Sequence, residues 1–205
     1  MTTDGASSAP AAVVRRLEGP GAAALAELVE TFEDLQTVLR CCERLVTELA
    51  VDAEADAVVV EALWTMVLLS YARCFASGEA GVRLTDEDLS ATQPSGDVLE
   101  WHQLLLQLRD HHAHPVANPR EQFSVGVAQD DDGAASGVAI TSARQPLVDD
   151  LTVRQTGAIA YALSGLVNNR IESRQGEVFE ELKKTPREEL EKLVQLDVTT
   201  PTTGA

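Results

Sequence analysis

The segment "LAELVETFEDLQTVLRCCERLVTEL", residues 25–49, decides the fold class of this chain of 205 residues. Its apolar side chains recur at steps of three or four residues, at Leu25, Leu28, Phe32, Leu35, Leu39, Cys42, Val46 and Leu49. Acidic residues such as Glu30 and Glu33 fall outside this stripe. A period near 3.6 residues is typical of an amphipathic helix with one buried face. We therefore predict a long helix over residues 21–50.

Composition favours the same class of fold. Hydrophobic residues make up 44% of the chain and aromatic residues only 4%, so Leu, Val and Ala must build most of the core. Such a core suits packed helices better than an aromatic-rich β-sandwich. A chain of 205 residues is also long enough to bury a sizeable core in one domain. We predict a mainly α protein, an up-and-down helical bundle in a single domain over residues 21–196.

Three further long helices follow from the same periodicity. A second, more apolar helix is predicted over residues 55–77, with Gly78 as its stop signal. A third is predicted from about residue 97 to residue 112, and a fourth over residues 150–174.

Two short helical segments are predicted from their start signals. "TDED" has the capping-box residues Thr85 and Asp88. "TPRE" begins a last helix with Thr185 as cap, Pro186 in the first position and Glu188 closing the box.

A β-hairpin is predicted between the third and fourth long helices, over about residues 123–144. Two runs with β-branched residues, "FSVGVAQ" and "SGVAITSAR", flank the acidic turn "DDDGAA". The two ends of the chain, residues 1–20 and 197–205, are small, polar and Pro-containing, so we expect them to be disordered.

Charge and cysteine content limit the function and the location. The chain has 16 basic and 33 acidic residues, a net charge of −17, which is unfavourable for a broad surface that tracks phosphates. No apolar run is expected to span a membrane and the first residues lack secretory features, so a cytoplasmic protein without membrane contact is predicted.

The three cysteines have neither a disulfide pattern nor metal-ligand spacing. We predict that they are reduced core residues, Cys41, Cys42 and Cys74.

The segment "LLQLRDHHAHPVANPREQ", residues 105–122, holds three of the four histidines. Arg109 falls in the last turn of the third helix, and Pro115 disfavours helical backbone at His114. In a continuous helix, side chains five residues apart would diverge by about 140°. Because the proline ends the helix, the chain can turn back and bring the imidazole and the guanidinium to one small anion.

This "RDHHAH" motif, an arginine, a polar residue, three more residues and a histidine at a helix end, resembles the signature of the HEPN-domain family. The resemblance covers the helical part, residues 21–174, less the hairpin, which is not general in that family. It implies a metal-independent endoribonuclease without a cofactor, in which a homodimer brings two motifs together. A role in toxin–antitoxin, stress or defence systems, with an antitoxin or other protein partner, is compatible with it.

By this resemblance Arg109, Asp110 and His114 are the catalytic residues. Histidine, with a pKa of about 6.5, suits proton transfer during attack by the RNA 2′-hydroxyl group. A guanidinium can meet the negative charge of the transition state with two parallel hydrogen bonds, and Asp110 would orient Arg109 or a histidine. Three further side chains are predicted to bind the substrate, His111, His112 and Arg120.

Other interpretations of these residues stay open. Arg109 and Asp110 also fit a surface ion pair at a helix end, and His102 fits a partly buried structural residue. "HHAH" could offer three imidazoles to zinc, although the adjacent His111 and His112 point in different directions. The main alternative to a nuclease is a non-catalytic dimeric interaction module, which the acidity of the chain favours.

Overall fold

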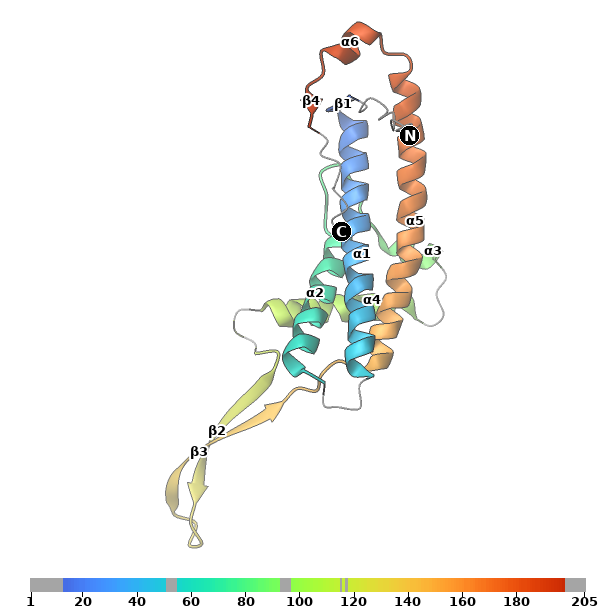
Figure 1. Cartoon of the computed structure of the whole chain (residues 1–205). Coiled ribbons are helices and arrows are strands. Elements are labelled where there is room, and N and C mark those ends of the chain that lie inside the picture. Colours follow the sequence, from blue (N-terminus) through green and yellow to red (C-terminus); the bar gives the residue numbers. More distant parts are fainter. Residues whose placement is uncertain (1–12, 51–54, 93–96, 115, 117, 198–205) are drawn as a thin grey trace, which may run out of the picture.

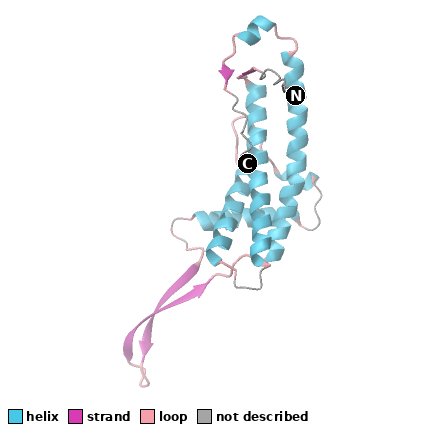
Figure 2. Cartoon of the chain, in the orientation of Figure 1, coloured by secondary structure: helices cyan, strands magenta, loops and turns pink. Residues whose placement is uncertain are grey.

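The structure, a computed structural model, describes residues 13–50, 55–92, 97–114, 116 and 118–197. Its helices are α1 (Pro20–Leu49), α2 (Ala57–Cys74), α3 (Asp86–Ala91), α4 (Val98–Ala113), α5 (Asp150–Leu182) and α6 (Arg187–Glu191). Its strands are β1 (Val14–Arg15), β2 (Glu121–Gln129), β3 (Ala135–Arg144) and β4 (Gln195–Leu196). The prediction of a mainly α fold with an inserted hairpin is confirmed (Figures 1 and 2).

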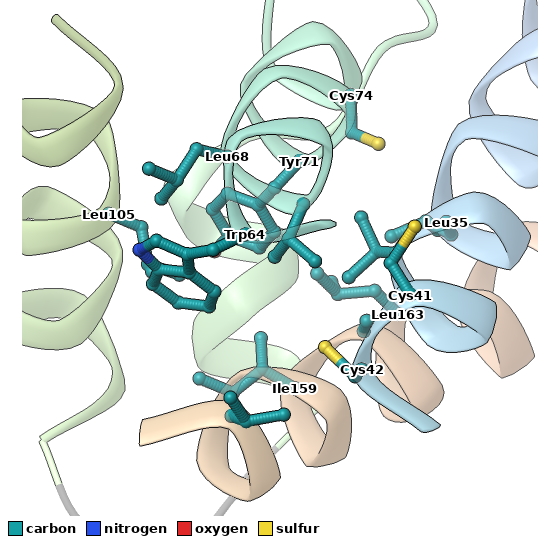
Figure 3. Packing of buried hydrophobic residues seen from close by; sticks show 14 of the residues in the cluster. Leu35, Cys41, Cys42, Trp64, Leu68, Tyr71, Cys74, Leu105, Ile159 and Leu163 are labelled. Carbon is teal, nitrogen blue, oxygen red and sulfur yellow. The ribbon is translucent and has the colours of Figure 1, made fainter. Parts of the chain in front are cut away.

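The core lies where α1 packs between α2 and α5 (Figure 1). Leu35, Val38 and Leu45 of α1 are completely buried there. They meet large apolar side chains of α2 and α5 (Figure 3), and α4 adds Leu105 from the other side of α2. Burying one such side chain contributes about 1.5–3 kcal/mol, so the apolar stripe of α1 contributes strongly to stability.

The starts of the helices follow simple chemistry. Three of them have an aspartate cap whose side chain accepts a backbone N–H of the first turn, Asp56, Asp97 and Asp149. At the start of α1 the backbone of Gly19 has φ +109°, and Pro20 follows in the first turn, where its missing N–H is not needed. The predicted capping box is present at α3, where the Asp88 carboxylate accepts the N–H of Thr85 at 3.0 Å.

Some predicted boundaries were wrong. Helix α2 ends at Cys74, three residues before the prediction, so Gly78 does not terminate it. Helix α5 continues beyond residue 174 to Leu182, because charged residues sustain the helix after the apolar stripe ends. In α6 the cap position is Pro186 and not Thr185, since the prolyl residue keeps an extended ψ of 144°.

The predicted N-terminal tail, residues 1–20, contains structure near its end. Strand β1 pairs antiparallel with β4, so the first and last segments that the structure describes meet. The Arg15 guanidinium strengthens this pairing by donating to the backbone carbonyl oxygens of Glu191, at the end of α6, and of Leu193, at 2.9 and 2.6 Å. Residues 1–12 and 198–205, the rest of the two tails predicted to be disordered, lie outside the described residues.

The expectation that no apolar run could span a membrane also needs correction. Among the described residues, α2 is long and apolar enough to do so by length and composition, with a mean hydropathy of 1.5 over 18 residues. Only Glu61 and Arg73 interrupt the run with charge. In the structure 44% of this span is buried, and α2 packs against α1 and α4 as the core helix of a soluble protein would.

A buried carboxylate connects α1 with the loop after α2. Glu27 accepts the backbone N–H groups of Ala80 at 2.8 Å and of Val82 at 3.0 Å. These hydrogen bonds, that of Ala80 first, lower the pKa of Glu27 below its ordinary value of 4.5, although burial opposes them. Gly78 lies so close that any side chain there would collide with the carboxylate. The loop is therefore shaped around Glu27.

We predict that Glu27→Gln destabilises the fold by about 1–3 kcal/mol, because the amide cannot accept both N–H groups and leaves a buried donor without a partner. In the parent, the lowered pKa gives stability that is complete above about pH 4.5 and declines below it. The variant should lose that part of the acid dependence. Urea unfolding between about pH 7 and pH 3.5 measures both effects, with the exposed Glu33→Gln as control. Equal stability of the two variants would contradict this role.

Candidate functional site

Helix α4 ends where the sequence predicts, at the start of the "HAHP" segment. Ala113 is its last residue, and His114 is extended, with φ −72° and ψ 127°. The backbone N–H of His114 still donates to the carbonyl of His111 at 3.4 Å, which closes the last turn. The exit from the helix at His114 is therefore confirmed, while Pro115, to which we attributed it, lies outside the described residues.

Arg109 lies one turn before this end and is paired with its neighbour. Its Nε atom is 2.9 Å from Oδ1 of Asp110, close enough for an ion pair but without the geometry of a hydrogen bond. The Nε–H group thus has no hydrogen-bond acceptor among the described residues. The side chain of Arg109 is 37% exposed and that of Asp110 is 71% exposed, so a ligand can reach both.

The three histidines after Arg109 differ in their surroundings. His112 donates from Nδ1 to the carbonyl of Leu108 at 2.9 Å, and its ring lies edge-on to that of His111, with centroids 6.2 Å apart. His114 accepts the N–H of Val116 on Nδ1 at 3.2 Å. When neutral, His114 therefore carries its proton on Nε2.

His112 and Arg120 line one hollow at the base of the hairpin. It has a volume of about 440 Å³ between α2, the end of α4 and the first residues of β2. Arg120 forms an ion pair there with Glu61, and Trp64 supplies part of the apolar wall. Of the six predicted site residues only these two line the hollow, so the structure does not gather all six in one cavity.

Glu61 is a residue of this hollow that the sequence analysis missed. Its side chain is 26% exposed and neutralises Arg120, which was predicted to bind substrate. An acidic residue in the first turns of the otherwise apolar α2 was a usable signal, because a charge in such a run needs a partner. Its partner could not be predicted, since the two residues are far apart in the sequence.

His102 has a structural role, as expected, and it is more buried than expected. Its Nδ1 is 3.0 Å from the hydroxyl of Tyr71, its ring packs on Phe75 with centroids 4.3 Å apart, and its Nε2 is 3.6 Å from Asp86. Burial lowers the pKa of His102 below 6.5, while Asp86 opposes that shift. His102 thus stays neutral near pH 7 and fixes α4 on α2.

The zinc interpretation finds no support in the geometry. Over the part of the chain that is described, no group of three or more His, Cys, Asp or Glu side chains is placed to hold a metal ion. His111 and His112 stand at a large angle to each other, as expected for neighbours on a helix. The three cysteines are free and buried, which confirms their prediction as core residues.

Comparisons with protein-family models, curated proteins and solved structures find no match for this chain. The resemblance to HEPN domains therefore depends on the "RDHHAH" motif and its place at the end of α4.

We predict that His102→Gln weakens the pH dependence of stability. Because the folded state binds the proton of His102 less tightly than the unfolded state, the parent loses stability as the pH falls below about 6.5. Glutamine retains a polar partner for Tyr71 but does not titrate. Thermal unfolding from about pH 7.5 to pH 5.5 should show a smaller slope for this variant. The exposed His111→Gln should keep the parent's slope, and a parent stability that is flat over this range would refute the assignment.

Proposed function

We propose that this chain is a metal-independent endoribonuclease of the HEPN type. The observation that carries the proposal is the end of α4, where Arg109 stands one turn before an extended and exposed His114. A fixed cation and an imidazole that can carry a proton thus lie within six residues on an accessible surface. These are the two chemical functions that RNA cleavage by the 2′-hydroxyl group needs.

His114 transfers the proton in this mechanism. In its protonated form, with the contact between Nδ1 and the N–H of Val116 opened, it gives the proton on Nε2 to the 5′-oxygen that leaves. The 2′-hydroxyl group loses its proton to water as its oxygen attacks the phosphorus, and the P–O5′ bond breaks, which gives a 2′,3′-cyclic phosphate and a free 5′-hydroxyl that carries the proton from His114. Arg109 stabilises the charge on the nonbridging oxygens, and Asp110 keeps its guanidinium in place.

A complete centre requires two copies of the chain. Within one chain, Arg109 faces Asp110 and His114 leaves the helix on an extended path. A two-fold axis near the ends of two α4 helices would place Arg109 of one copy beside the second copy's motif. His111, His112 and Arg120 would then bind the flanking phosphates once RNA displaces the ion pair of Arg120 with Glu61.

A second candidate function is a dimeric interaction module without catalysis. The pairing of Arg109 with Asp110 favours it, since this acid competes with phosphate for the guanidinium. The net charge of −17 also slows the approach of RNA. In this case the "RDHHAH" motif would only stabilise the end of α4, and its substitution would leave every activity of the protein unchanged.

We predict that His114→Ala lowers the cleavage of a single-stranded oligoribonucleotide by about 10²- to 10⁴-fold, and that Arg109→Ala lowers it by a comparable factor. Neither variant should unfold, because neither side chain belongs to the buried core. Single-turnover assays with purified protein measure the rates. Arg154→Ala, which removes an exposed arginine of α5, is the control and should cleave as the parent does. A folded His114→Ala variant with parental activity would exclude the catalytic assignment.

We also predict that cleavage persists in excess chelator, and that an oligonucleotide with a 2′-deoxyribose at the cleaved position is inert. The attacking group is then the RNA's own hydroxyl, with histidine as the proton carrier. Elemental analysis of the purified protein complements the assay. About one zinc per chain, lost together with activity on chelation, would favour the histidine–zinc site instead.

A further inference from the structure

The hairpin presents an apolar face that no other part of the described chain covers. Strands β2 and β3 project away from the helices (Figures 1 and 2). In their register Val125 lies opposite Ile140 and Val127 opposite Val138, so these side chains share one face. The face consists of five large side chains that are 59% to 78% exposed, Phe123, Val125, Val127, Val138 and Ile140.

The opposite face has a different character. It carries small or polar residues, with Ser124 opposite Thr141 and Gly126 opposite Ala139. A two-stranded ribbon alone is only marginally stable in water, and an uncovered patch of this size usually marks a binding surface. The apolar face therefore needs an occupant.

Charge restricts what that occupant can be. Between Gln122 and Gln129, and between Ala135 and Ala143, neither strand carries a formal charge, although the chain as a whole has −17. A charged partner would gain nothing from this face. A membrane is disfavoured too, because Asp130, Asp131 and Asp132 at the hairpin tip would have to enter it first.

We propose that the occupant is the same face of a second copy, with two hairpins packed face to face about a two-fold axis along their length. An uncharged apolar face is complementary to itself, as an isologous contact requires. At about 100 Å² of apolar surface for each large side chain, five from each copy remove on the order of 1,000 Å² from water. That area reaches the lower limit for a specific protein interface.

Of the two possible orientations, the parallel one serves the motif. It brings the two hairpin bases together, and β2 starts at Glu121, seven residues after His114. In this orientation the acidic hairpin tips of the two copies also come side by side. They stay about 10 Å apart, because this is the usual distance between two packed sheets. Exposed charges at that distance are largely screened at physiological salt. The orientation rests on the proposed function, which needs two motifs near one axis, whereas the use of this face does not.

The test changes the same number of charges on each face. Val125→Lys/Ile140→Lys should convert a dimer of the full chain into a monomer at micromolar concentration, a loss of at least about 100-fold in affinity. Ser124→Lys/Thr141→Lys, on the opposite face of the same residue pairs, should remain dimeric. Both variants make the chain less acidic, so reduced repulsion cannot explain dissociation. Sedimentation velocity measures the mass. A monomeric parent, or a dimer that survives the first pair of substitutions, overturns the proposal.

Cross-linking determines the orientation. In the parallel arrangement, a single Phe123→Cys or Val127→Cys variant lies next to its own counterpart, and a short thiol-specific linker joins the two copies. In the antiparallel arrangement only the central Val125→Cys would be joined, which overturns the parallel orientation. The native cysteines are buried and give little background.

If cross-linked dimers form but cleave no RNA, the proposed nuclease fails and the interface stands. If RNA is cleaved and the apolar-face variant stays dimeric, the interface fails and the nuclease stands.

Discussion

The whole structure depends on one constraint, that α1 buries its apolar stripe on two sides at once. Leu35, Val38 and Leu45 lose all contact with water between α2 and α5. Because α2 is fixed in this way, its Tyr71 can hold His102 and thereby place α4. The direction of α4 in turn sets where the "RDHHAH" motif and the hairpin leave the helical body. The candidate site is therefore positioned by packing at residues that precede Arg109 by 64 to 74 positions in the chain.

The sequence predicted elements whose pattern is local. Examples are the apolar stripe of α1, the capping box of Thr85 and the β-branched runs of the hairpin. In each of them the residues that form the pattern follow one another at short spacings, and the predicted structure was confirmed. Contacts between distant segments could not be predicted. The β1–β4 pairing and the ion pair of Arg120 with Glu61 depend on the tertiary fold, and no local signal announces a partner. The last eight residues of α5, 175–182, were missed because this end is mostly exposed and lacks an apolar stripe.

The net charge of −17 is compatible with the proposed RNA cleavage if most of the acidic residues lie on other surfaces than the candidate site. The end of α4 combines Arg109 with three histidines, and Asp110 is the only acidic residue among residues 109–114. Screening at physiological salt limits the repulsion by carboxylates more than about 8 Å away. Under the proposed function, RNA that presents its phosphates locally, in a loop or at an end, would be cleaved in preference to long duplexes.

The central claim is that two copies of the chain complete one active centre, and complementation tests it most directly. Arg109→Ala and His114→Ala, each inactive alone, are mixed, unfolded and refolded together so that mixed dimers form. A centre that combines Arg109 of one copy with His114 of the other is then intact once in every mixed dimer. The account predicts recovery of roughly a quarter of the parental activity, since about half of the dimers are mixed. A refolded mixture as inactive as its components would contradict a centre shared between copies.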